Sequence, residues 1–188
     1  YDVDVTGNAD IGGGILARGS SLVAERVNVV GATAVLYGGG IAVEAPAFAV
    51  GTVLLTDVVF DGTVNGALSV NWAGAECLRC RFIEPSGASA AVWTGNDSPI
   101  TFVDSEFVRP ANSVGYLAGA IQAASPLTLV RTTICGAGGG YAIRADGGGT
   151  IVNSRILDSE GTALFLAGDW AIANNDILGG GFGVVGRV

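Results

Sequence analysis

The chain has 188 residues, of which 31 are Gly, 49% are hydrophobic and only 14% are charged. Its mean hydropathy of +0.53 raises the question of a membrane span, but the longest weakly charged stretch, residues 27–55, is interrupted by a Gly triplet, Glu44 and Pro46. It lacks the roughly 18 consecutive apolar residues of a spanning helix. The net charge of −8 argues against nucleic acid as a partner and against membrane insertion or binding to anionic membranes, because anionic partners require a basic patch.

A decapeptide pattern recurs along the chain, with apolar third and eighth residues and a small sixth residue. Its seven copies are Leu22–Gly31, Val53–Gly62, Ala75–Glu84, Ile100–Arg109, Leu127–Gly136, Gly149–Asp158 and Trp170–Gly179. Successive copies start 31, 22, 25, 27, 22 and 21 residues apart. This spacing is typical of one coil per repeat in a β-solenoid, with loops taking up the variation.

A second short strand, introduced by Gly or Ala, lies between successive decapeptides. Its eight copies begin at Gly14, Gly40, Ala67, Ala90, Ala120, Ala142, Ala163 and Gly183. Period-2 alternation places the second residue of each copy inward and the third outward. The sequence therefore predicts an all-β fold, a parallel β-helix of about eight coils and three sheets. We expect one domain over residues 1–188, as a segment of a longer solenoid.

The outward positions of these Gly/Ala-led strands are apolar for a face that meets solvent. The row of third residues is Leu16, Ala42, Ser69, Val92, Gln122, Arg144, Phe165 and Val185. Such a patch is typical of a surface on which another chain or a loop packs, and exposed aromatic residues also suit stacking on sugars. We therefore expect an interaction surface that includes Leu16, Val92, Phe165, Val185, Trp72 and Trp93.

The fifth position of the decapeptide is polar in every copy: Arg26, Asp57, Arg79, Asp104, Arg131, Asn153 and Asn174. The third and sixth residues both point inward only if the chain bends between them, and Asn and Asp tolerate the left-handed conformation of such a bend. Arg does so at a cost, so the coils with Arg are expected to turn differently. In-register stacking would align five alternating charges. We expect this ladder to set the register rather than to add stability, since an exposed ion pair contributes about 0–1 kcal/mol; the alternative is a chance alternation.

With this bend the repeat resembles the pectate-lyase-like superfamily of right-handed parallel β-helices, in which an Asn-favouring bend joins the second and third sheets. The resemblance covers nearly the whole chain and implies a right-handed coil. The Gly-Gly-Gly-Ile copies also resemble repeats of autotransporter passengers and polymorphic outer-membrane proteins, although the companion Phe-x-x-Asn motif of those repeats is absent.

Enzymes of the superfamily need residues that this chain does not assemble. Polygalacturonase-like hydrolases use clustered Asp residues with a His and an Arg-Ile-Lys segment, and this sequence has neither His nor Lys. Pectate lyases bind Ca²⁺ on carboxylates that project from one sheet, and the predicted outward row has none. Glu44 and Asp146 of the next outward row are four coils apart, about 19 Å, too far to share one substrate bond. We therefore predict no catalytic residues.

No cofactor is expected, and a calcium site and a cysteine site each have a simpler interpretation. Calcium would need Asp57 with Asp61, or Asp158 with Glu160, although Asp residues in turns usually cap their own backbone. Cys77 and Cys80 fall at inward positions, either as buried thiols or as a disulfide across the bend in an exported protein, whereas Cys135 points outward.

These features predict a non-enzymatic structural or adhesive β-solenoid of a cell-surface or extracellular protein, with filament formation expected. Its partners would be flanking coils or further copies of the chain. The alternative is a carbohydrate-active enzyme or glycan-binding module of pectate-lyase-like fold, such as a phage tail spike, that binds neutral glycans through Trp72 and Trp93.

Overall fold

The computed structural model describes residues 3–19, 21–46, 51–113, 117–180 and 182–186, with side chains described up to residue 180. This part of the chain forms 25 strands and no helix, and therefore no helix able to cross a membrane. The strands pair in parallel with strands of the neighbouring coils, not with their neighbours in sequence. The result is a β-solenoid of about seven turns, as the repeat predicted.

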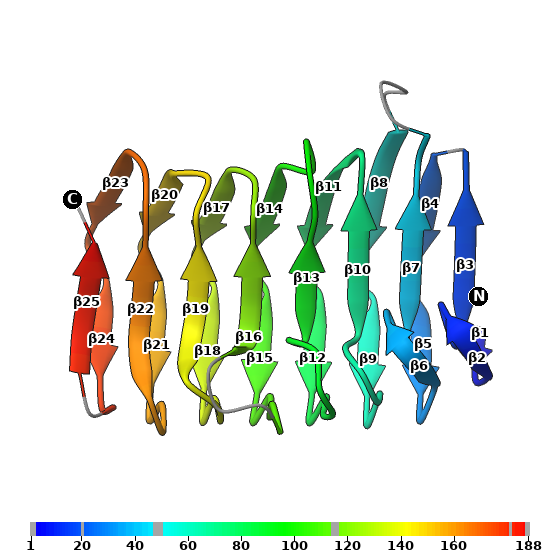
Figure 1. Cartoon of the computed structure of the whole chain (residues 1–188), viewed down its shortest axis with the longest axis horizontal. Helices are drawn as coiled ribbons and strands as arrows, with labels where there is room; N and C mark the ends of the chain where they lie inside the picture. Colours follow the sequence, from blue (N-terminus) through cyan, green and yellow to red (C-terminus); the bar gives the residue numbers. More distant parts are fainter. Residues whose placement is uncertain (1–2, 20, 47–50, 114–116, 181, 187–188) are drawn as a thin grey trace.

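The eight Gly/Ala-led segments form one eight-stranded sheet, here called the front sheet because it faces the viewer in Figure 1. Its strands are β3 (Ile15–Arg18), β7 (Ile41–Glu44), β10 (Leu68–Asn71), β13 (Val92–Thr94), β16 (Ala118–Ala123), β19 (Tyr141–Ala145), β22 (Thr162–Leu166) and β25 (Phe182–Gly186). The prediction that these segments stack as one strand per coil is confirmed.

Each decapeptide supplies one strand to each of two further sheets. The second sheet contains β4 (Leu22–Glu25), β8 (Gly51–Thr56), β11 (Ala73–Leu78), β14 (Ile100–Val103), β17 (Leu127–Val130), β20 (Gly149–Val152) and β23 (Trp170–Ala173). The third sheet contains β1 (Val3–Val5), β5 (Val27–Val30), β9 (Val59–Asp61), β12 (Arg81–Ile83), β15 (Glu106–Val108), β18 (Thr133–Cys135), β21 (Arg155–Leu157) and β24 (Asp176–Leu178). A small additional sheet pairs β2 (Asn8–Ile11) with β6 (Thr33–Tyr37).

The coil is right-handed. In Figure 1 the front strands point upward, the strands of the second sheet point downward behind them, and successive coils advance from the N-terminal end at the right to the C-terminal end at the left. Right-handed connections are the rule between parallel strands because of the twist of L-peptide strands.

The bend between the second and third sheets occurs at the fifth position of every decapeptide. All seven residues there are left-handed, with φ between 49° and 55°. The expectation that coils with Arg turn differently is wrong: Arg26, Arg79 and Arg131 have the same backbone as Asn153. Inward residues on both sides must reach the core, so packing imposes the bend and outweighs the roughly 1–2 kcal/mol that a non-Gly residue loses in this conformation.

A second left-handed column, which the sequence analysis did not predict, lies at the tenth position of the decapeptide, where the third sheet ends. Its members are Gly31, Gly62, Glu84, Arg109, Gly136, Asp158 and Gly179, all with positive φ. Gly at four of the seven copies was the sequence signal for it. The third-sheet strands are thus bounded by a left-handed residue at each end, which fixes their length.

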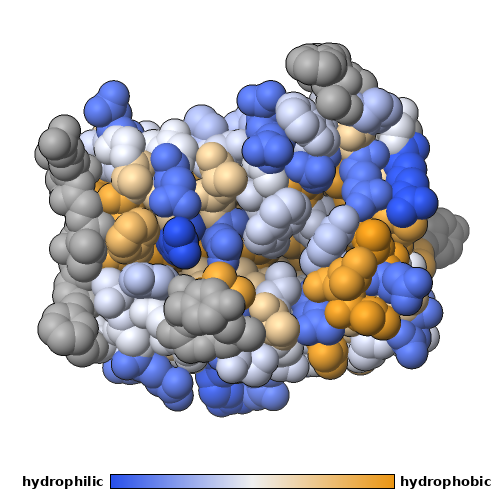
Figure 2. Space-filling view, viewed as in Figure 1, coloured by the Kyte–Doolittle hydropathy of each residue, from blue (hydrophilic) through white to orange (hydrophobic). Residues whose placement is uncertain are grey.

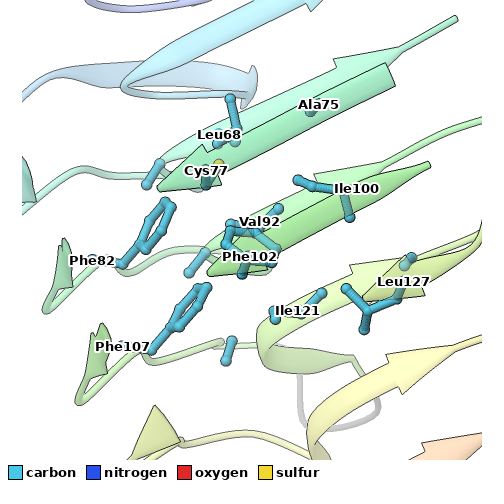
Figure 3. Close-up of a cluster of buried hydrophobic side chains, with 14 of the residues drawn as sticks. Leu68, Ala75, Cys77, Phe82, Val92, Ile100, Phe102, Phe107, Ile121 and Leu127 are labelled. Carbon is cyan, nitrogen blue, oxygen red and sulfur yellow. The ribbon is translucent and has the colours of Figure 1, made fainter. Parts of the chain in front are cut away.

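The core is a set of columns of identical positions along the rod. At the eighth position, the rings of Phe60 and Phe82 stack with centroids 4.9 Å apart, and those of Phe82 and Phe107 stack at 4.4 Å, each pair tilted by 8°. Phe102, from the third position of its copy, packs edge-on against Phe107, with centroids 5.4 Å apart and planes at 71°. Figure 3 shows the rings of Phe82, Phe102 and Phe107 within the buried cluster. Gly40 is required beside this stack, because a Cβ there would lie 2.7 Å from Phe60 Cδ1.

The sixth position is polar in the last four copies, where Ser105, Thr132 and Ser154 are buried and Asn175 is half-buried. The hydroxyl of Ser105 accepts a hydrogen bond from the Cys80 amide at 3.1 Å and lies 3.2 Å from the Cys77 carbonyl, to which it donates. The Ser154 hydroxyl accepts from the Thr132 amide, and the Asn175 side chain accepts from the Ser154 amide. These small polar side chains satisfy backbone groups that the bend removes from the sheets, which explains why they are tolerated inside.

We predict that Phe82→Ala lowers the free energy of unfolding by about 3–5 kcal/mol, because the ring is fully buried between two stacked neighbours. Urea denaturation measures the change. Val23→Ala, at a side chain that is 72% exposed, is the control and should change stability by less than about 0.5 kcal/mol. A loss of under about 1 kcal/mol at Phe82 would contradict the stacked core.

The bend gives a second prediction, at Asn153, whose φ is 52°. Asn153→Val should destabilise the fold by about 1–2 kcal/mol, because a β-branched residue is strained there. Asn153→Gly removes the same side chain without strain, so its free energy of unfolding should stay within about 1 kcal/mol of that of the original chain. Equal losses in the two variants, measured by chemical denaturation, would place the effect in the side chain rather than in the backbone.

Candidate functional site

The outward row of the front sheet differs from the predicted row at one strand. Val92 pairs with Leu68 and Ile121 and is fully buried, so its assignment to the interaction surface is wrong. Trp93 takes the outward place, between Ser69 and Gln122. The fourth Gly/Ala-led segment begins with two Ala residues. Its leading position is Ala91 and not Ala90, so the register is one residue later than the sequence pattern predicted.

Trp93 lines a hollow of about 290 Å³ on this face. Three connections from the third sheet to the front sheet, together with the front strands, contribute its walls. They supply Leu36, Tyr37, Ala88, Ser89, Ala90, Trp93, Leu117 and Gln122. The rings of Tyr37 and Trp93 are 5.7 Å apart and inclined by 31°. Gly95 makes room for the indole, since a Cβ there would lie 2.7 Å from Trp93 Cη2.

A polar group adjoins the aromatic pair. The Tyr37 hydroxyl donates to Glu44 Oε1 at 2.8 Å, and Arg18 Nε donates to Glu44 Oε2 at 2.9 Å. Partial burial, and then the hydrogen bond to Glu44, raise the pKa of Tyr37. The phenol therefore stays protonated near neutral pH, and its ring is held in a fixed orientation beside the hollow.

The other residues of the predicted interaction surface do not join Trp93 in one patch. Phe165 lies three strands further along the row, where its ring is 5.3 Å from that of Tyr141 and 5.5 Å from the Arg144 guanidinium carbon. Leu16, 40% exposed, lies at the N-terminal end, where Figure 2 shows apolar surface gathered over the first coils. Trp72 is half-buried against the core. Val185 pairs with Phe165 in register, and its side chain lies outside the described part.

The predicted register ladder consists of two strong pairs rather than a continuous chain of charges. Arg79 donates two hydrogen bonds to Asp57, at 2.6 and 2.8 Å, and Arg131 donates two to Asp104, at 2.6 and 2.9 Å. Arg26 instead pairs with its neighbour Glu25. The hydrogen bonds from Arg lower the pKa of both Asp residues. Asn153 and Asn174 continue the same left-handed column without charge.

Two further charged columns were missed by the sequence analysis. At the seventh position Arg81 pairs with Glu106 at 3.0 Å, and Arg155 with Asp176 at 3.4 Å. At the tenth position Arg109 pairs with Glu84. Aligning the seven copies by column would have revealed the opposite charges in successive rows. Every Arg in the described part is ion-paired with a carboxylate.

The residues weighed for calcium are not brought together into a metal site. Asp57 is held by Arg79, and the described residues contain no cluster of three or more His, Cys, Asp or Glu suited to an ion. Cys77 and Cys80 are fully buried thiols that form no disulfide, and burial raises the pKa of Cys77. Cys135 is half-buried on the outer side of the third sheet.

No family model, curated protein or solved structure matches this chain. The function is therefore inferred from the hollow on the front sheet and from the charged columns of the rod.

The lowered pKa values of Asp57 and Asp104 predict loss of stability in acid. In the unfolded chain an Asp titrates at about pH 3.9, so the ion-paired carboxylates stabilise the fold above that pH and cease to do so as the pH falls below it. The double variant Asp57→Asn/Asp104→Asn should melt below the original chain near neutral pH, and the difference in Tm should vanish toward about pH 2.

Asn is accepted at this position, as Asn153 and Asn174 demonstrate, so the backbone is not the cause of the difference. Asp97→Asn, an exposed loop carboxylate, is the control for loss of one charge. A Tm difference that is constant across the pH range would contradict the role assigned to the two ion pairs.

Proposed function

We propose that the chain is a non-enzymatic structural and adhesive β-solenoid of a cell-surface or extracellular protein. The left-handed column between the second and third sheets supports a relationship to the pectate-lyase-like superfamily, and the Gly-Gly-Gly-Ile copies support a comparison with surface passengers. In this proposal the coils are a rigid scaffold, and the connections that vary between coils carry the adhesive contacts.

The structural part of the proposal rests on ion pairs that run along the rod, from one coil to its neighbour. Pairs in three columns join neighbouring coils, as between Asp57 and Arg79, Arg81 and Glu106, and Glu84 and Arg109. A carboxylate held by two guanidinium hydrogen bonds remains ionised, so it is poorly suited to donate a proton near neutral pH. These charged groups therefore suit the stacking of coils better than the role of a general acid.

The hollow beside Trp93 supports an adhesive contact with uncharged glycans, and so favours the glycan-binding module as the second candidate function. An aromatic ring stacks on the apolar face of a sugar, and the Gln122 amide and Ser89 hydroxyl offer polar partners to hydroxyl groups. The hollow, of about 290 Å³, is close to the lower limit of ligand pockets. The net charge of −8 disfavours acidic polysaccharides.

A glycan array, probed with and without calcium, tests the adhesive contact. The chain should bind neutral glycans, and Trp93→Ala should weaken binding about tenfold, because stacking area is lost. Phe165→Ala, in the same outward row but away from the hollow, should bind like the original chain. Equal losses in the two variants would contradict a site at Trp93.

Incubation with the best glycan separates adhesion from catalysis. An adhesive protein leaves the glycan intact, whereas an enzyme releases reducing ends or unsaturated products. Product formation that follows protein concentration would overturn the non-enzymatic proposal and favour the carbohydrate-active alternative.

A further inference from the structure

The outer face of the third sheet has an apolar row that lies between charged columns. The second copy has Asp61 at the ninth position, and the apolar row runs from the third copy onward as Ile83, Val108, Cys135, Leu157 and Leu178 in register. The first four are half-buried, and Leu178 is 60% exposed. An apolar row flanked by charges is the arrangement of a surface that pairs with a partner.

Three coils carry opposite charges on the two sides of this row. The seventh and tenth positions are Arg81 and Glu84 on one coil, Glu106 and Arg109 on the next, and Arg155 and Asp158 on a later coil. All of these side chains except the half-buried Glu106 are exposed. The order of the signs reverses between the first of these coils and the second, so the pattern distinguishes these two adjacent coils.

This pattern is complementary to itself. A two-fold axis parallel to the rod, lying in the contact plane, exchanges the two sides of the row. The seventh position of one copy then faces the tenth position of the same coil in the other copy. Arg81 faces Glu84 of the second copy, Glu106 faces Arg109, and Arg155 faces Asp158. We propose that two copies of this chain pack side by side in parallel through the outer face of the third sheet.

The same charges select the register of the two rods. A shift of one coil would place Arg81 opposite Arg109 and Glu84 opposite Glu106, so like charges would meet on both sides of the row. Like-charge contacts are unfavourable and exclude wrong alignments. In the aligned register the apolar rows meet in the centre, and the two Cys135 side chains lie close to the axis.

The size of the face sets the strength of the contact. The apolar row from Ile83 to Leu178 spans five strands, about 19 Å, and the contact is only a few residues wide. The buried area is therefore smaller than the roughly 800 Å² per partner of a stable complex. The pairing is therefore weak and reversible for an isolated segment and suits covalent trapping. It extends the structural role proposed above, and its test does not depend on glycan binding.

Cys135 provides the reporter for the test. Cys77 and Cys80 are fully buried, so a short bis-maleimide applied to the folded chain should react at Cys135 and yield a cross-linked dimer. Cys135→Ser should abolish the dimer. Absence of a cross-linked dimer in the original chain at high protein concentration would overturn the proposal.

Two charge variants test the arrangement. Asp158→Arg and Arg155→Asp each place like charges across the axis and should reduce cross-linking about tenfold or more. Both changes use residue types that the same positions hold in other coils, Arg109 at the tenth and Asp176 at the seventh. Arg155→Asp also removes the ion pair with Asp176 of the next coil, so the Tm of each variant is measured beside its cross-linking to show that the fold is retained.

An equimolar mixture of the two variants is the decisive measurement. One variant has two positive side chains at positions 155 and 158 and the other has two negative ones, so a mixed pair is complementary on both sides of the axis. Cross-linking should return to the original level, with one copy of each variant in every dimer. A mixture that stays monomeric overturns the parallel arrangement. If the variants still bind glycans in that case, the pairing alone has failed and the adhesive function proposed above stands.

Discussion

Each coil of this rod must place its left-handed residues directly beside those of the preceding coil. The fifth and tenth positions of the decapeptide are left-handed in all seven copies, and the parallel strands between them pair without a shift. A slip of one residue would turn every inward side chain outward. Because slips are excluded, each sequence position becomes a column that runs along the rod. The stacked Phe rings, the polar column of Ser105 and Ser154, and the ion pairs all follow from that alignment.

The alignment also explains which features could be predicted from the sequence. Period-2 alternation and the repeat identified the strands, the inward Phe60–Phe82–Phe107 column and the first bend, since each is a local pattern repeated many times. The predicted register of the fourth front strand was wrong by one residue, because either Ala90 or Ala91 fits the leading position of the pattern. The second bend was obscured because Glu84, Arg109 and Asp158 occupy a position at which other copies have Gly.

The candidate site was less predictable for a physical reason. The hollow draws Tyr37, Ser89 and Leu117 from connections of different length in three coils, and no periodic pattern describes where such segments meet. Of the residues that line the hollow, the sequence pattern identified Trp93 as an exposed aromatic residue and Gln122 as an outward residue of the front strands. The junction between the third and front sheets is the corner at which these connections differ most, whereas the bend between the second and third sheets is one residue in every coil. Specific contacts arise at the variable corner, as is usual for loops on a rigid scaffold.

The columns have a mechanical consequence. The backbone hydrogen bonds of all three large sheets join one coil to the next, so they lie along the length of the rod. Tension applied from end to end would therefore load the coils in series, and the contact between two coils with the fewest bonds would open first. A pull across the rod at the Trp93 hollow would instead be shared among neighbouring coils. Such a rod resists a load on its side better than a load along its axis.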